Sequence, residues 1–217
     1  MERDESAVDR YSAGITQRSG HMGFLTEGLK SHTLTIEDIS NHLDSLDHST
    51  RIEEVRSLGP SAQKSLWTLT AGTQLTLEDF VPTSVADLEP VIHYGRNTLP
   101  VFKMFEKRFC RAPEGTDTQG LWGYNEGSTR SFVGPGYFVC RSTGGDERGS
   151  IVIDYTLIPA GKSSDWPNIT PNERGVSRFV YAGMEDFMRR VSQHVTIGRA
   201  YRYGKASNNY FMLCRER

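Results

Sequence analysis

The first part of the chain carries apolar residues at the three- and four-residue spacing of short amphipathic helices. A first helix is predicted from Thr35, whose hydroxyl can cap a turn that contains two acids. A second begins near Ser49 or Thr50 and ends at Gly59-Pro60, and a third runs from that proline to about residue 70. The apolar positions of these helices are Ile36, Ile39, Leu43, Leu46, Ile52, Val55, Leu58, Leu66, Trp67 and Leu69.

The following segment is interrupted by prolines. Residues 72–100 contain Pro82, Pro90 and Pro100, so a connector with one or two turns of helix is expected. After Pro100 a helix is predicted, because proline suits the first helical position, and a strand is the alternative. The apolar residues of this segment are Val101, Phe102, Phe105 and Phe109.

After Arg111 the pattern changes to strand-like stretches separated by loops rich in Gly, Pro and Asn. Hairpin loops are expected at 143–149 and 204–209, with a long loop over 159–178. The predicted strands cover residues 130–142, 150–158, 194–204 and 209–215. One helix is predicted before the third strand, from Val180, Met184, Phe187, Met188 and Val191.

These elements predict an α+β fold in which an N-terminal group of short helices packs on a four- or five-stranded, mainly antiparallel sheet. The length of 217 residues suits one domain with a helical addition. Three regions are expected: a flexible tail over residues 1–32, a helical acidic region with its connector over 33–99, and a basic α+β sheet domain over 100–217.

The charged residues are unevenly distributed along the chain, although the net charge is only −2. Residues 1–91 hold 15 acids against 7 Lys and Arg, whereas residues 92–217 hold 18 Lys and Arg against 12 acids. The two parts can attract each other within the fold, or the basic part can face an anionic ligand. The acidic first part argues against a nucleic-acid partner.

The absence of long apolar runs in the sequence indicates where in the cell the protein is expected. No run approaches the roughly 20 apolar residues that a membrane-spanning helix needs. The first residues are charged where a signal peptide has its apolar core. A soluble, cytoplasmic protein without a membrane partner is therefore expected.

Each of the three cysteines, Cys110, Cys140 and Cys214, is followed by an arginine. Positive charge beside a thiol can activate it as a nucleophile. In a strand, however, successive side chains point to opposite faces, which separates Cys140 and Cys214 from their arginines. We interpret the thiols as buried and the arginines as solvated. The odd count without CxxC spacing indicates neither a disulfide framework nor a zinc site, and no metal or cofactor is predicted.

Arg199 interrupts an otherwise apolar face of the predicted strand over 194–204. A buried arginine needs an acidic or anionic partner, so it pairs with Asp154 or holds an anionic ligand. His194 has a side chain that titrates near neutrality and could act as a general base. The segment LWGYNEG supplies Trp122 and Tyr124 for a pocket mouth, and the alternative is a tryptophan that closes one end of the core.

The leading hypothesis is a cytoplasmic binding or sensory module for a small anionic or aromatic ligand. One alternative is an enzyme in which His194 or Asp154 transfers a proton, but no known catalytic motif is present and catalysis is not favoured. Another is an interaction module that docks a protein partner through Leu43, Leu46, Ile52 and Trp67 of the helices. The ligand-binding residues of the leading hypothesis are Arg199, Arg202, His194, Trp122, Tyr124 and Arg130.

Overall fold

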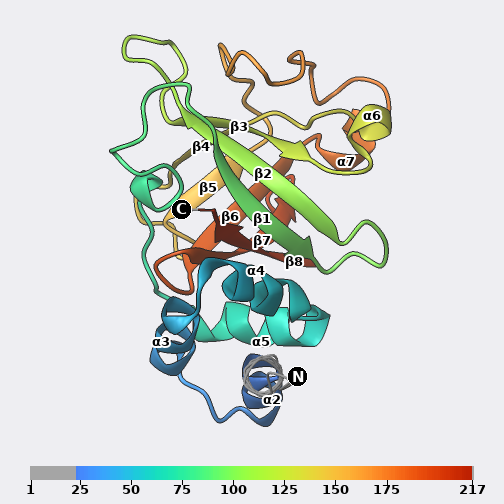
Figure 1. Cartoon of the computed structure of the whole chain (residues 1–217). Coiled ribbons are helices and arrows are strands. Elements are labelled where there is room, and N and C mark those ends of the chain that lie inside the picture. The colour runs from blue at the N-terminus through green and yellow to red at the C-terminus, as the bar shows by residue number, and fades with distance from the viewer. Residues whose placement is uncertain (1–22, 217) are drawn as a thin grey trace, which may run out of the picture.

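The computed structural model describes residues 23–216, and its centre is a closed antiparallel barrel of eight strands (Figure 1). The strands follow one another around the barrel in chain order, and β8 closes it by pairing with β1. Closure removes the unpaired edges of an open sheet. The strands are β1 Val91–Asn97, β2 Met104–Arg111, β3 Leu121–Glu126, β4 Phe138–Ser142, β5 Ile151–Asp154, β6 Met184–Arg190, β7 Val195–Arg202 and β8 Lys205–Arg215.

The prediction of a four- or five-stranded sheet packed with helices is therefore wrong. Two segments predicted as helices, after Pro100 and around Phe187, form strands β2 and β6. In each strand a charged residue, Lys107 in β2 and Asp186 in β6, occupies an inward position, so the apolar residues do not alternate cleanly and also fit a helical period. The proline-rich connector contains the further strand β1.

The predicted strand over 130–142 is divided. Its first residues form the short helix α6 (Arg130–Val133), and only its last part is β4. Gly134 and Gly136 lie between the two with φ of 93° and 55°, a backbone region that favours glycine. The predicted strands at 150–158, 194–204 and 209–215 are confirmed as β5, β7 and the second part of β8.

The three predicted helices are confirmed as α3 (Ile36–Ser45), α4 (His48–Ser57) and α5 (Pro60–Leu69). Thr35 caps α3 and Pro60 begins α5, as the sequence predicts. The cap of α4 is Asp47, whose carboxylate accepts a hydrogen bond from the backbone N–H of Thr50 at 3.0 Å. A further helix, α2 (Phe24–Ser31), lies in the region predicted as a tail; residues 1–22 of that region lie outside the described residues.

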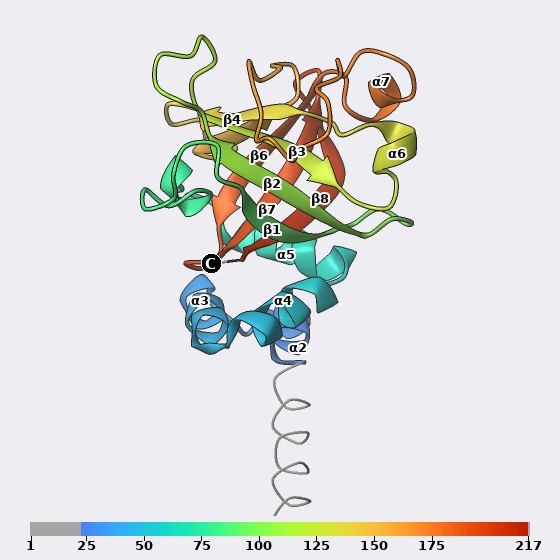
Figure 2. The ribbon, with the colours of Figure 1, turned by 45° about the horizontal axis from the view of Figure 1, so that its top comes forward.

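Helices α2–α5 gather on one side of the barrel (Figure 2). Their apolar side chains are buried together with the outward-facing residues of β7 and β8. Leu43, Leu46 and Trp67, which the interaction hypothesis assigned to a partner, are buried in this cluster. Its members include Leu25, Leu29, Ile39, Leu58, Leu66, Ile197, Met212 and Cys214.

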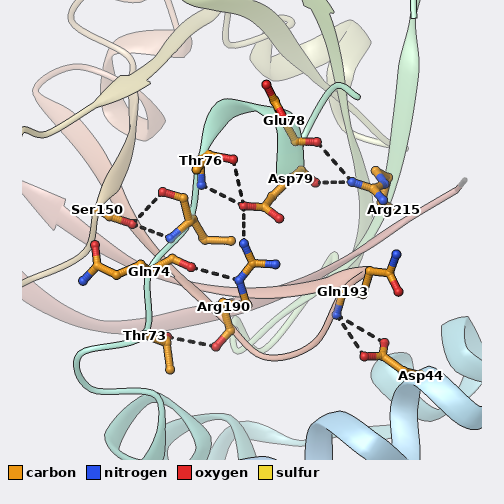
Figure 3. A network of polar contacts seen from close by, with 11 residues as sticks. Asp44, Thr73, Gln74, Thr76, Glu78, Asp79, Ser150, Arg190, Gln193 and Arg215 are labelled. Carbon is orange, nitrogen blue, oxygen red and sulfur yellow. Dashed lines mark hydrogen bonds and ion pairs between the residues drawn. The ribbon is translucent and has the colours of Figure 1, made fainter. Parts of the chain in front are cut away.

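One end of the barrel, here the closed end, is covered by residues 70–90, which we name the plug segment. It contains the 3₁₀ turn η1 (Leu77–Asp79) and places Phe80 in the barrel interior. Arg190 donates to the Asp79 carboxylate at 2.6 Å, and Arg215 donates to the Asp79 carbonyl at 2.7 Å (Figure 3). Ser150 donates to the Leu75 carbonyl at 3.0 Å, so side chains from three strand ends or turns hold the plug segment.

The opposite end, here the loop end, is formed by connections 98–103, 127–137, 155–183 and 203–204. It carries α6 and the short helix α7 (Ser177–Val180), which Figures 1 and 2 both show on the right. Residues between Tyr155 and Asn172 leave this end and pack with Trp166 over the outer face of β2–β4. Between the two ends, aromatic rings cross the interior over glycines: a Cβ on Gly123 or Gly198 would overlap the ring of Phe138 or Phe211.

Candidate functional site

An ion pair spans the interior of the barrel. Lys107 lies on β2 and Asp186 on β6, four strands apart in an eight-stranded ring and therefore on opposite walls. Lys107 Nζ nevertheless lies 3.3 Å from Asp186 Oδ2, with side-chain exposures of 3% and 6%. The two side chains meet in the middle of the lumen and are closed off from solvent.

Two further polar side chains complete the surroundings of the Lys107 ammonium. It donates to Asn125 Oδ1 at 2.9 Å and to the hydroxyl oxygen of Tyr155. Asn125 is itself held by its Nδ2, which donates to the Gly136 carbonyl at 3.0 Å. With Asp186, the three N–H groups of the ammonium each have an acceptor, which is the condition for burying a charge.

Aromatic rings surround the same ammonium. Lys107 Nζ lies 4.9 Å from the ring centres of Tyr155 and Phe211, 5.1 Å from that of Phe138 and 5.7 Å from that of Phe105. Cation–π attraction operates at such distances and is stronger without water. We name this group the lumen site; its residues are Lys107, Asp186, Tyr155, Asn125, Phe105, Phe138 and Phe211.

Burial is the main cause of the pKa shifts of the titratable residues in the lumen site. It lowers the pKa of Lys107 and raises the pKa of Asp186, while the charge of each partner opposes the shift of the other. Burial also raises the pKa of Tyr155 well above its ordinary value. Each charge therefore persists only because its partner is present, and a change at one group alters the protonation of the other.

Tyr181 roofs the lumen site at the loop end. Its ring stacks on that of Tyr155, with centres 5.3 Å apart and planes inclined by 15°. The ring passes close over Gly136, where a Cβ would overlap it. Tyr181 directly follows α7, and Arg202 donates to the carbonyls of Phe179 and Val180 in that helix at 2.8 and 2.7 Å. The roof is thus carried by a four-residue helix that a side chain of β7 fixes.

Arg199 and Asp154 do not form the predicted pair. Arg199 donates to the Ser207 carbonyl at 2.8 Å and lies over the rings of Tyr201 and Tyr210. Asp154 instead accepts from Arg141 at 2.8 Å. Both residues lie on the outer face of the barrel, but strand β6 separates β5 from β7. Arg141 on the neighbouring strand β4 therefore pairs with Asp154, and the β7–β8 hairpin supplies the acceptor for Arg199.

The other predicted site residues are spread over the barrel. His194 lies in the β6–β7 turn at the closed end, with Nδ1 3.2 Å from Arg215 Nη2, and burial, then the charge of Arg215, lower its pKa. Trp122 packs on the outer face of β3 and donates to the Thr118 carbonyl at 3.0 Å.

Tyr124 and Arg130 are brought together, through a shared acid. Arg130 Nε donates to Glu126 Oε1 at 2.8 Å, and the Tyr124 hydroxyl donates to Glu126 Oε2 at 3.2 Å. The six predicted ligand-binding residues therefore do not converge on one site, and their role in binding stays a prediction. The lumen site is the more coherent cluster, and the sequence reasoning did not find it.

The three cysteines are buried free thiols, as interpreted. Burial raises the pKa of Cys110 to about 12 and that of Cys214 to about 11, and it also raises the pKa of Cys140. The interpretation of solvated arginines is wrong for Arg215, which is buried and donates to the plug segment. Charge beside these thiols does not outweigh their burial.

Because the three thiols are buried, we expect them to react slowly in the native protein. Ellman's reagent at pH 8 is expected to label the native protein only slowly, because thiolate formation and access both require opening. In denaturant all three thiols should react at once. Rapid labelling of one thiol without denaturant would contradict the buried placement. A Thr68→Cys variant, with its new thiol on the exposed side of α5, provides the fast-reacting control.

Among residues 23–216, no cluster of three or more His, Cys, Asp or Glu side chains is placed to hold a metal ion. In the same part of the chain, the helices are all too short or too polar to cross a bilayer. Comparison of the chain with protein-family models, with curated proteins and with solved structures gives no match.

Proposed function

We propose that the barrel binds a small ligand with an aromatic body and a carboxylate at the lumen site. The observation that supports this is a buried ion pair that crosses the lumen among four aromatic rings. A buried pair of this kind usually adds less stability than apolar side chains of the same volume, and strongly perturbed pKa values are concentrated at functional sites. Eight-stranded barrels have room for interior side chains or for one small ligand.

The charges of the site define how the ligand binds. Its carboxylate replaces Asp186 as the anionic partner of Lys107, and Asn125 supplies a second donor. Asp186 then takes up a proton, in the direction in which burial already raises its pKa. The number of charges in the lumen stays the same. Binding is therefore coupled to uptake of one proton, which calorimetry in buffers of different ionisation enthalpy measures.

The ligand's ring takes the place of Tyr181 on Tyr155. This position is the stacked contact nearest the loop end, and only the short helix α7 has to move to free it. The proposed entrance is thus between α7 and α6. The free buried thiols fit a reducing compartment, and we propose that the protein acts in the cytoplasm.

Phenylacetate and benzyl alcohol provide matched probes, since they share a ring but only the first carries a charge. Phenylacetate is expected to raise the melting temperature of the protein and to give a calorimetric isotherm, because ligands that bind only the native state stabilise it. Benzyl alcohol should do neither. The double variant Lys107→Met/Asp186→Leu should remain folded and lose the response.

The control is Arg108→Met, which removes a cation from the same strand but from a partly exposed pair with Glu106. It should bind phenylacetate as the unchanged protein does. The proposal fails if aromatic carboxylates of this size leave the melting temperature unchanged, or if the double variant binds them equally well.

A further inference from the structure

Exposed apolar side chains are concentrated at the loop end. In residues 23–216, twelve large apolar side chains are exposed, and nine of them lie on or directly beside residues 98–103, 127–137, 173–183 and 203–204 of the loop end. Phe132 on α6 is 76% exposed, Phe179 on α7 66% and Phe102 in the β1–β2 connection 61%. The other six are Leu99, Val101, Met104, Val176, Val180 and Tyr203.

Charge distinguishes the two ends of the barrel as well. Residues 98–103, 127–137, 173–183 and 203–204 of the loop end hold four Lys and Arg against one acid. Arg130 is paired with Glu126, so the other cations of the loop end are Lys103, Arg174 and Arg178. At the closed end, residues 70–90, 112–120, 143–150 and 191–194 hold eight acids against one Arg. This charge distribution favours an orientation in which the loop end faces a negatively charged surface.

The apolar and cationic groups are neighbours at the tips of the loops. The Arg178 guanidinium lies 4.6 Å from the ring centre of Phe179, and Lys103 follows Phe102 in the chain. Arg202 donates to the carbonyls of Phe179 and Val180, which ties α7 to β7 while the Phe179 side chain stays exposed. An aromatic ring with a cation beside it suits the boundary between acyl chains and anionic headgroups.

We propose that the loop end docks on the surface of a bilayer that contains anionic lipids. The apolar tips belong to separate connections around a barrel mouth, and a fluid interface accepts several separate insertions, whereas a protein partner needs a complementary pocket for each. Docking of this kind requires no spanning segment. It departs from the expectation of no membrane partner. Its residues are not those of the lumen site, so it can be tested separately from the ligand proposal, although α6 and α7 also border the proposed entrance.

Vesicle sedimentation tests the docking. The full chain is expected to sediment with phosphatidylcholine vesicles that contain 30% phosphatidylglycerol, and at least tenfold less with phosphatidylcholine alone, because the cations contribute only with anionic lipid. Binding should fall steeply between 0.1 and 0.5 M NaCl as salt screens the charges. The variant Phe132→Ser/Phe179→Ser should bind anionic vesicles at least tenfold less. Leu69→Ser, at a 38% exposed apolar residue on α5, should bind normally.

Three results would overturn the docking proposal. One is sedimentation that does not depend on phosphatidylglycerol, and another is an equal loss in Leu69→Ser. The third is concentration-dependent dimerisation that the double serine variant abolishes while vesicle binding is absent, since the loop end is then a protein interface. Lys107→Met/Asp186→Leu should bind vesicles as the unchanged protein does, so failure of the ligand proposal and failure of docking give separate results.

Discussion

Lys107→Met is expected to lower the free energy of unfolding by about 3–5 kcal/mol, the usual effect of removing one partner from a buried ion pair. Methionine fills a similar volume and keeps its contacts with the rings of Phe138 and Phe211. The loss arises because Asp186 is left buried without a cation. Urea unfolding at pH 7 measures it, and the denaturant dependence should stay unchanged if the native state remains as compact.

Adding Asp186→Leu to Lys107→Met should recover this stability. An apolar pair of similar volume is often neutral or stabilising by about 1–4 kcal/mol relative to a buried ion pair. Arg108→Met, which disrupts a partly exposed pair on the same strand, should change stability by less than about 1 kcal/mol. A double variant as unstable as Lys107→Met would show that the ion pair has a structural role, and the functional argument for the lumen site would be lost.

The helical part of the fold is predictable because its signals are local. Thr35 and Pro60 mark helix starts through contacts within one turn, and those helices are where the sequence places them. The strand pairings that close the barrel join residues far apart in the sequence. Val91 pairs with Phe109 across a hairpin, but Tyr94 also pairs with Cys214, which lies 120 residues further along the chain. Local propensity carries no information about such closure.

The lumen site was missed for the same reason. Lys107 and Asp186 stand in the charged runs FEKRF and MEDFMRR, which indicate a solvated surface when each segment is considered a helix. Only the strand register directs both side chains inward, and only barrel closure brings β2 opposite β6. Arg199 attracted attention because it breaks an apolar face, a signal that is visible in sequence, yet its acceptor is a hairpin carbonyl.

The stability of the protein is expected to fall between pH 6.5 and pH 3 partly because of His93. This side chain lies at the base of the lumen, 1% exposed, between the rings of Phe80 and Phe109. Its Nε2 donates to the Phe80 carbonyl at 2.9 Å, since that oxygen can only accept. Burial is the main cause that lowers the pKa of His93 to about 3, with the charge of Arg215 acting in the same direction.

The sign of the effect follows from proton binding. An unfolded histidine titrates near pH 6.5. Below that pH the histidine of the unfolded chain binds a proton, whereas His93 in the native protein stays neutral. The free energy of unfolding therefore decreases as the pH falls. The loss is about 1.4 kcal/mol per pH unit, or roughly 2.7 kcal/mol at pH 4.5. His93→Gln removes this titration and keeps a donor for Phe80. Urea unfolding at pH 6.8 and 4.5 should therefore show a smaller pH dependence in His93→Gln, whereas the exposed His32→Gln should behave as the unchanged protein. Parallel behaviour of all three proteins would mean that His93 is protonated in the native state, and the base of the lumen would then have to admit water.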